Sequence, residues 1–347
     1  LQGKRLPKRK EVARGLVALC KRQAHDVRAN CLQALGNLLR GSSDPEVLSY
    51  LIANLQLNDH TLFLSALDGV SAMQDPRIVD TLASRIPDLP LVLKRHAVEA
   101  LGTQPAQRKR SIPLLQTLLE DKESMIRGAA AWALLKLRGG KLEELGRVAT
   151  GTGWAARVNA TAALAGRRHP AARDLLRRLA RDRDPYVRAN AMLGLAWLKD
   201  KGASLRFAQQ SIRDRSPWAR INALRGLVWL QARDIDAASQ RYDTALDLAK
   251  HLAQNDPDGR IRGIARVLAK GERAFRKQRT WIGLYLLDRD DRPLRDKPFV
   301  LVTPDGLVKA AHADVRSQAW EEGLLSGRCH VELPARRPGL STRSTGN

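Results

Sequence analysis

The chain has 347 residues, 44% of them hydrophobic, which is enough to bury a large core. It carries 60 Lys and Arg against 36 Asp and Glu, and this formal net charge of +24 favours an anionic partner such as nucleic acid, anionic lipid or an acidic protein surface. Three cysteines without ligand spacing argue against a disulfide framework and a zinc site, and predict a reducing, cytoplasmic location. No apolar run of about 18 residues and no signal-peptide pattern occurs, so neither a membrane span nor export is predicted.

The first ten residues are rich in Lys and Arg, and we predict a basic N-terminal arm over residues 1–10. From Glu11 the apolar residues follow helical spacing, with Val12, Leu16 and Leu19 expected on the buried side of the first helix. A second apolar run begins at Val27, so the chain opens with a pair of amphipathic helices.

The joint between paired helices recurs along the chain, and an Arg marks each copy. These arginines are separated by 67, 32, 30, 31 and 32 positions and are Arg28, Arg95, Arg127, Arg157, Arg188 and Arg220. The first interval counts as two, with an apolar residue near Phe63 in place of the Arg. A further joint, 256–262, follows a longer interval, for which we expect a longer first helix around 242–251. We therefore predict a helical-hairpin repeat array over residues 11–275.

The residues around each joint explain why a helix starts there. Asp184 before Pro185, and Ser216 before Pro217, place a capping side chain ahead of a residue that lacks the N–H left unpaired at a helix start. Small residues such as Ala189 and Ala191 follow, which allows neighbouring helices to approach closely. One hairpin cannot bury its apolar face alone, so the predicted fold is mostly α, an α-solenoid of about seven to eight stacked repeats.

This pattern resembles the HEAT-repeat family over roughly residues 10–275, particularly its short bacterial form, which phycobilin-lyase relatives share. The resemblance implies a ladder of Asp and Arg between successive repeats, and the Asn that follows the Arg by two positions in four repeats is expected to tie turns together. The predicted structural ladder comprises Asp26, Arg28, Asn30, Arg127, Arg157, Asn159, Asp184, Arg188, Asn190, Arg220 and Asn222. The alternative is that the Asn and Arg row lines a ligand surface.

After residue 279 the pattern changes from helical spacing to alternation, which predicts a small all-β domain over residues 280–334. Pro304-Asp305-Gly306 is a strong turn signal because Gly accepts a positive φ angle. The expected strands cover residues 281–287, 298–303, 307–310 and 327–334. The tail, residues 335–347, has almost no apolar content and is predicted to be disordered.

This segment resembles the transthyretin-like or carboxypeptidase-regulatory-like β-domains of type VI secretion tip proteins and their cargo. The matching residues include Trp281-Ile282, Arg292-Pro293, Pro298-Phe299, Pro304-Asp305-Gly306 and Gly327-Arg328-Cys329. The chain departs from that pattern where Asp290-Asp291 replaces the Gly of the first turn. The resemblance implies attachment or spacing rather than catalysis, with a secretion-system tip or cargo protein as partner.

No constellation of catalytic, cofactor-binding or metal-binding residues stands out. The seven histidines are scattered, and no nucleophile elbow, P-loop or dinucleotide fingerprint occurs. The aromatic side chains at three joints, beside the Arg, are candidate partner contacts: Trp154, Tyr186 and Trp218. Helix ends covered by these rings are the structural alternative.

The sequence thus predicts a non-enzymatic interaction scaffold or adaptor, accessory to a bacterial contractile injection system of the type VI kind, with a protein partner that offers an acidic surface. The alternative is a basic solenoid that binds DNA or RNA, as HEAT-like DNA glycosylases do in DNA repair.

Overall fold

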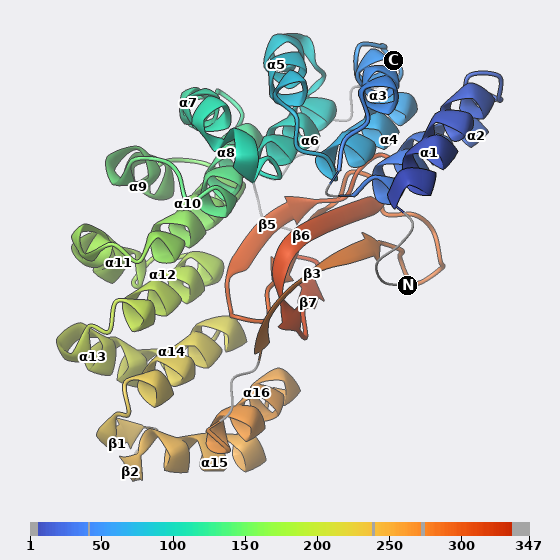
Figure 1. Ribbon diagram of the computed structural model, residues 1–347. Coiled ribbons are helices and arrows are strands. Elements are labelled where there is room, and N and C mark those ends of the chain that lie inside the picture. Colours follow the sequence, from blue (N-terminus) through green and yellow to red (C-terminus); the bar gives the residue numbers. More distant parts are fainter. Residues whose placement is uncertain (1–5, 41, 238–239, 272–274, 335–347) are drawn as a thin grey trace. The chain divides into compact units, whose positions relative to one another are not determined.

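The computed structural model describes residues 6–40, 42–237, 240–271 and 275–334 and is mostly helical, with a small β-region at the C-terminal end (Figure 1). The chain divides into two compact units, residues 1–172 and 173–347. The expected disordered tail, 335–347, and the first five residues of the expected arm lie outside the described residues.

The first unit consists of helices in consecutive pairs. The pairs are α1 (Leu6–Cys20) with α2 (His25–Leu38), α3 (Pro45–Leu55) with α4 (His60–Ser71), α5 (Pro76–Arg85) with α6 (Leu91–Leu101), α7 (Arg108–Leu118) with α8 (Ser124–Lys136), and α9 (Leu142–Thr150) with α10 (Trp154–Arg167). The second helix of each pair packs on the second helices of its neighbours, α2 on α4, α4 on α6, α6 on α8 and α8 on α10. This stacking buries a continuous core that no single pair could form.

Aspartate caps fix where several of these helices begin. Asp44 accepts hydrogen bonds from the backbone N–H groups of Glu46 (3.1 Å) and Val47 (3.3 Å), ahead of Pro45. Arg14 of α1 donates to the same carboxylate at 2.8 Å, and the Arg14 guanidinium holds the pKa of Asp44 below its usual range. One side chain therefore both starts α3 and joins it to the preceding repeat.

The start of the chain differs from the sequence-based expectation in two ways. α1 begins at Leu6, so residues 6–10 of the expected arm are helical. Val12 and Leu19 are exposed, whereas Ala13, Val17 and Cys20 are fully buried. The buried side of α1 is therefore not the one expected from Val12, Leu16 and Leu19. Ala13, Val17 and Cys20 also recur at helical spacing, and they present smaller side chains to the neighbouring helix.

The second unit continues the helix pairs, α11 (Arg173–Leu179) with α12 (Pro185–Trp197), α13 (Lys201–Ser211) with α14 (Pro217–Trp229), and α15 (Ala245–Asn255) with α16 (Gly259–Ala269). The prediction of a longer first helix around residues 242–251 is wrong. A hairpin of β1 (Arg233–Ala237) and β2 (Gln240–Thr244) precedes α15, and Ile235 pairs with Tyr242 in its register. Both of these side chains are buried while their strand neighbours are exposed, which is the alternation of a strand.

The β-region, residues 275–334, is built from two small antiparallel sheets. β3 (Phe275–Tyr285) pairs with β6 (Gln318–Gly327), and β4 (Pro298–Val302) lies between β5 (Val308–His312) and β7 (His330–Glu332). The core consists of Phe299, Leu301 and Ala311, packed against side chains that include Leu284 and Ala319 of the β3–β6 ribbon. The two sheets therefore share one apolar interior.

The sequence-based expectation missed β6. In this strand Glu321 lies between Trp320 and Glu322. Its carboxylate is buried and accepts a 2.7 Å hydrogen bond from the buried ammonium group of Lys309 on β5. A charged side chain can face inward only because a partner on another strand neutralises it, and no local pattern reveals such a partner. The expected turn is present, with the Thr303 N–H donating to Leu307 O at 2.8 Å and Gly306 at φ +101°.

The closest helix packing predicts opposite effects for two Gly-to-Ala changes. A Cβ atom at Gly36 of α2 would lie 2.3 Å from Gly69 Cα of α4, so Gly36→Ala should lower the free energy of unfolding by about 1–3 kcal/mol through overpacking. Gly15 of α1 has nothing within 4 Å of that position, so Gly15→Ala should stabilise by up to about 1 kcal/mol through helix propensity. Urea unfolding followed by circular dichroism measures both, and equal shifts would contradict the close contact.

Candidate protein interface at the last repeats

The periodic arginines are bound within the helical array. Arg188 donates to both oxygens of Asp214, at 2.6 and 2.7 Å, and to the carbonyl oxygen of Asp182 at 2.8 Å, and Asp214 raises the pKa of Arg188. Arg220 repeats the pattern one unit later, with Asp256 at 3.3 Å and the carbonyl oxygen of Asp214 at 2.6 Å. Each Arg thus connects the loop within its own helix pair to the corresponding loop within the next pair.

The other arginines of the predicted ladder vary this arrangement. Arg127 donates to three carbonyl oxygens, of Asp121, Lys122 and Thr152, and Arg28 donates to Asn54 Oδ1 at 2.6 Å. Arg157 is half-buried. In Arg28 and Arg127 the guanidinium donates to carbonyl or amide oxygens of the protein, so its charge is used within the fold.

Asp184 and Asp26, the aspartates predicted for the ladder between repeats together with Arg188 and Arg28, make other contacts. Asp184 caps its own helix, accepting from the N–H groups of Tyr186 (2.8 Å) and Val187 (3.3 Å). Asp26 and Asn30 are exposed, and Asp26 contacts His25 at 3.1 Å. A capping aspartate is held by the helix start, so the carboxylate that meets Arg188 comes from the following repeat instead.

The later ladder asparagines tie neighbouring second helices together. Asn159 donates to Gly128 O of α8 at 3.1 Å, and Asn222 donates to Ala189 O of α12 at 2.8 Å. All of these groups are buried, so each bond satisfies a carbonyl and an amide that water cannot reach.

Two of these asparagines, together with Arg225, also hold the β-region. We call Asn190, Asn222 and Arg225 the polar row. Asn190 both donates to Val308 O (2.9 Å) and accepts from Val308 N–H (2.8 Å), while Asn222 donates to Gly306 O at 3.0 Å. Arg225 donates to Pro304 O at 3.0 Å and to Asn222 Oδ1 at 2.9 Å. The turn between β4 and β5 is therefore bound through its main chain by α12 and α14.

Arg225 is the member of the polar row whose burial is least favourable, because its side chain is charged. It is 3% exposed, and burial lowers its pKa to about 10, while the charge of Asp305 acts in the opposite direction. The guanidinium remains protonated at neutral pH, so a charge is held here largely by a carbonyl and an amide oxygen. Gly306 makes this approach feasible, since a Cβ atom there would lie 2.0 Å from Arg225 Nη1.

The predicted contact aromatics are not gathered on one free surface. Trp218 is buried by β7, where its Nε1–H donates to Glu332 at 2.7 Å and its ring lies 5.0 Å from the His330 ring. The Arg260 guanidinium covers the same indole, also at 5.0 Å. Tyr186 is buried, and Trp154 is half-buried in the other compact unit. Trp218 is thus a contact residue whose partner is the chain's own C-terminal strand.

An aromatic face that the sequence analysis did not predict lies on the β3–β6 ribbon. We call Trp281, Tyr285 and Trp320 the aromatic face. They are 54%, 56% and 43% exposed, and the Trp281 and Trp320 rings stack at 4.3 Å with an angle of 17° between their planes. Trp281, Gly283 and Tyr285 occupy every second position of β3 and therefore share one face of the strand. This spacing is the sequence signal from which the aromatic face could have been predicted.

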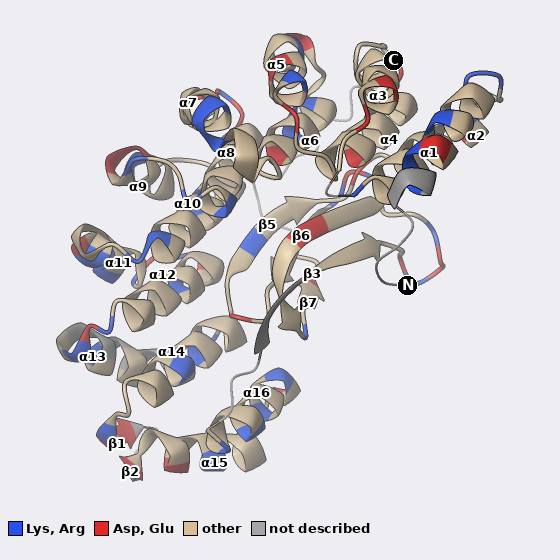
Figure 2. Ribbon diagram, viewed as in Figure 1, with Lys and Arg blue, Asp and Glu red and all other residues tan. Residues whose placement is uncertain are grey.

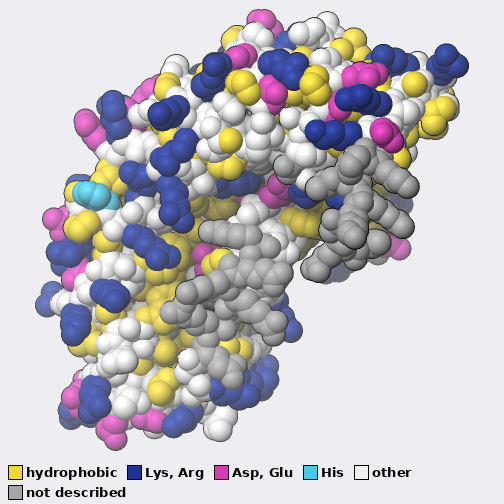
Figure 3. All heavy atoms as spheres, in the orientation of Figure 1, with side chains coloured by type: hydrophobic (Ala, Val, Ile, Leu, Met, Phe, Trp, Pro, Cys, Tyr) yellow, Lys and Arg dark blue, Asp and Glu magenta, His cyan; other side chains and the backbone are white. Residues whose placement is uncertain are grey.

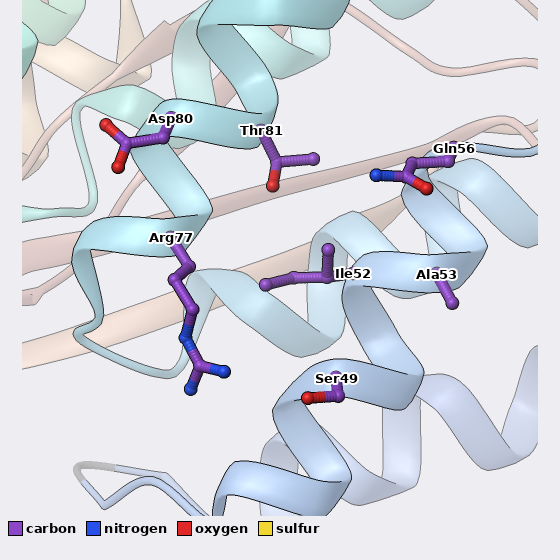
Figure 4. A pocket seen from close by; sticks show the side chains of 7 residues that line it. All are labelled: Ser49, Ile52, Ala53, Gln56, Arg77, Asp80 and Thr81. Atoms are coloured by element: carbon purple, nitrogen blue, oxygen red, sulfur yellow. The ribbon is translucent and has the colours of Figure 1, made fainter.

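Neither the surface charge nor the pocket described below indicates a second binding site as clearly as the aromatic face does. In the views of Figures 2 and 3, Lys and Arg are interspersed with Asp and Glu rather than collected into one stripe. An open pocket of about 400 Å³ lies between α3 and α5, lined by side chains that include Ile52, Arg77 and Asp80 (Figure 4). Within the described ranges no three His, Cys, Asp or Glu side chains converge as metal ligands. No helix in the same ranges is long and apolar enough to cross a membrane.

Removing the amide of Asn222 should destabilise the chain strongly. Asn222→Ala leaves Ala189 O, Gly306 O and an Arg225 N–H unpaired in a buried site, for a loss of about 3 kcal/mol in the free energy of unfolding. Asn30→Ala, at the equivalent but exposed position, should change it by less than about 0.5 kcal/mol. Urea unfolding compares the two, and equal losses would show that Asn222 does not bridge these groups.

The burial of His330 predicts that β7 packs less firmly against the helices at acidic pH. Burial, followed by the charges of Arg328 and Arg260, lowers the pKa of His330 below 6.5. A His whose pKa is lowered by packing stabilises the packed state above its ordinary pKa of about 6.5, and this stability is lost as pH falls below that value. Hydrogen exchange of β7 amides, corrected for intrinsic rates, should be faster at pH 5.5 than at pH 7.5. His330→Gln should remove most of this difference, and an unchanged pH dependence would assign it to other groups.

Comparison with known proteins agrees with this architecture. A family model described as HEAT repeats matches residues 79–150 and 142–205. The solved structure of YibA from Escherichia coli is similar at a TM-score of 0.50 with 15% identity, over 78% of this chain and 98% of that one. The CpcE–CpcF complex of phycocyanin lyase from Nostoc sp. has a TM-score of 0.44 and 20% identity over 65% and 88%, respectively. No curated protein matches the chain. The predicted fold class is confirmed: the chain forms an α-solenoid, which HEAT repeats match over residues 79–205, followed by a small antiparallel β-region.

Proposed function

We propose that the chain is a non-enzymatic protein-interaction scaffold, and that the aromatic face of its β-region binds a protein partner. The stacked Trp281 and Trp320 carry this proposal. Contiguous exposed aromatic surface is uncommon on soluble proteins and marks interaction sites, and Trp and Tyr are the residues that most often dominate binding energy. The polar row holds the β4–β5 turn, so the helical repeats act as the support.

The charge of the chain fits a protein partner with an acidic surface. A net charge of +24 accelerates encounter with such a partner without requiring a specific basic groove. The alternative, binding of DNA or RNA in DNA repair, depended on a row of periodic arginines facing outward. Arg188 and Arg220 instead bind carboxylates of the next loop, and breaking those pairs would be required before they could contact phosphate.

We further propose that the partner is a tip component or cargo of a contractile injection system of the type VI kind, and that binding takes place in the cytoplasm. The support is the resemblance of the β-region, including Pro304-Asp305-Gly306 and Gly327-Arg328-Cys329, to domains that attach proteins to such tips. In this chain the Pro304-Asp305-Gly306 turn contacts α12 and α14, which leaves the β3–β6 ribbon for the partner.

Replacing the two indoles should abolish partner capture. The full chain is used as bait in extract of its source cells, beside Trp281→Ser with Trp320→Ser, and captured proteins are identified by mass spectrometry. We expect the double variant to lose at least about 90% of a specific partner that the unchanged chain retains. Leu57→Ser, a change at another exposed apolar residue, serves as the matched control and should retain it.

Two results would contradict this proposal. One is a partner set that the double variant captures as well as the unchanged chain. The other is capture that nuclease removes and that falls on the order of 10³-fold between 50 and 200 mM salt, as expected for about six phosphate contacts. The second result would favour the nucleic-acid alternative.

A further inference from the structure

The polar row recognises main-chain atoms. Asn190 bonds Val308 N and O, Asn222 bonds Gly306 O, and Arg225 bonds Pro304 O, at 2.8 to 3.0 Å. All four of these bonds go to the backbone of residues 304–308, whose side chains contribute to none of them. A segment with a different sequence but the same backbone path would satisfy the row equally well.

The steric requirement of the site falls on one position of that segment. Gly306 has φ +101°, and a Cβ atom there would lie 2.0 Å from Arg225 Nη1 and 2.5 Å from Asn222 Oδ1. A side chain at this position would be strained and would collide with two members of the row. The ligand defined by these contacts is a β-turn with Gly at the equivalent place and its carbonyl groups turned outward.

The site also makes its present occupant replaceable. Arg225 is buried under the turn, and its bonds go to a carbonyl and an amide oxygen, without a carboxylate at ion-pair distance among the described side chains. Loss of solvation therefore offsets much of what the turn gains by docking. A competing turn with the same backbone meets no larger cost.

The β-region can leave the polar row without unfolding. Its core of Phe299, Leu301 and Ala311 and its Lys309–Glu321 ion pair lie inside the region itself. Its strand pairs are likewise internal. Release would break the four bonds to the row and the contacts of Trp218 and Arg260 with β7. It would also expose Val300, Val302 and Val308, which are buried outside that core, while the strand pairing within both sheets stayed intact.

We propose that the polar row is a receptor for a Gly-containing β-turn of a partner protein, and that the chain's own turn, residues 304–308, is a displaceable occupant. The proposal adds a second partner surface to the proposed scaffold function and rests on it for its biological use. Asn190 and Asn222 occupy equivalent places in successive repeats, so the receptor follows the spacing of the second helices. Partner binding at the row would free the β-region from the repeats.

A cyclic peptide with the sequence of residues 301–309, closed by a disulfide between added terminal cysteines, is the probe. The receptor is the full chain carrying Gly306→Ala, which prevents its own turn from docking but keeps the polar row. We expect saturable one-to-one binding by calorimetry, and at least about 10-fold weaker binding to the unchanged chain, because the tethered turn competes at an effective concentration on the order of 1 mM. Adding Asn190→Ala should remove binding, as should the matched peptide with Ala in place of Gly.

Absence of saturable binding to the Gly306→Ala chain up to about 1 mM peptide would overturn the proposal and leave the row as an internal latch. Binding that survives Asn190→Ala would overturn it as well. If Gly306→Ala prevents folding, the unchanged chain is used, and excess peptide should accelerate hydrogen exchange of the Val308 amide, which donates to Asn190. No acceleration would again count against the receptor. Peptide binding tests the polar row, whereas partner capture by the Trp281 and Trp320 variants tests the aromatic face. Either proposal can therefore fail without the other.

Discussion

The amide of Asn222 is the interaction on which the second unit depends. Its Nδ2 group donates to a carbonyl of the preceding repeat and to Gly306 of the β-region, and its Oδ1 accepts from Arg225. One buried side chain therefore connects two helices and a sheet turn. A hydrophobic residue of the same size would fill the volume but leave three polar groups without partners, and that penalty makes the position specific.

Some of the positive charges of the chain are paired inside the fold, and others are exposed to solvent. Guanidinium groups at the joints, such as those of Arg188 and Arg220, neutralise carboxylates and loop carbonyls and hold successive repeats in register. The Lys and Arg visible on the surface in Figure 3 are interspersed with acidic side chains, and solvent screens their charges. Net charge alone therefore overstates the case for a phosphate-binding groove.

Much of the fold was readable from local patterns, because each repeat encodes its own helix starts and its own apolar spacing. The Asp184-Pro185 cap, the Pro304-Asp305-Gly306 turn and the change from helical spacing to alternation all act within a few residues. The β1–β2 hairpin, residues 233–244, was not predicted. β6 was not predicted either, since Glu321 and Lys309 bury their charges only by pairing between strands. The buried role of Trp218 was hidden for the same reason, as Glu332 lies 114 positions away.

The sequence by itself determined the repeat length, the helix pairs, the late β-region and the residue types available at each joint. Tertiary structure decided how those residues are used. Asn159 ties two helices, Asn190 holds a turn, Asn222 does both and Asn30 lies exposed, although all four follow a joint Arg by two positions. The physical reason is that an amide offers donors and an acceptor in a fixed geometry, while the groups that satisfy them come from segments far apart in the chain and brought together by folding.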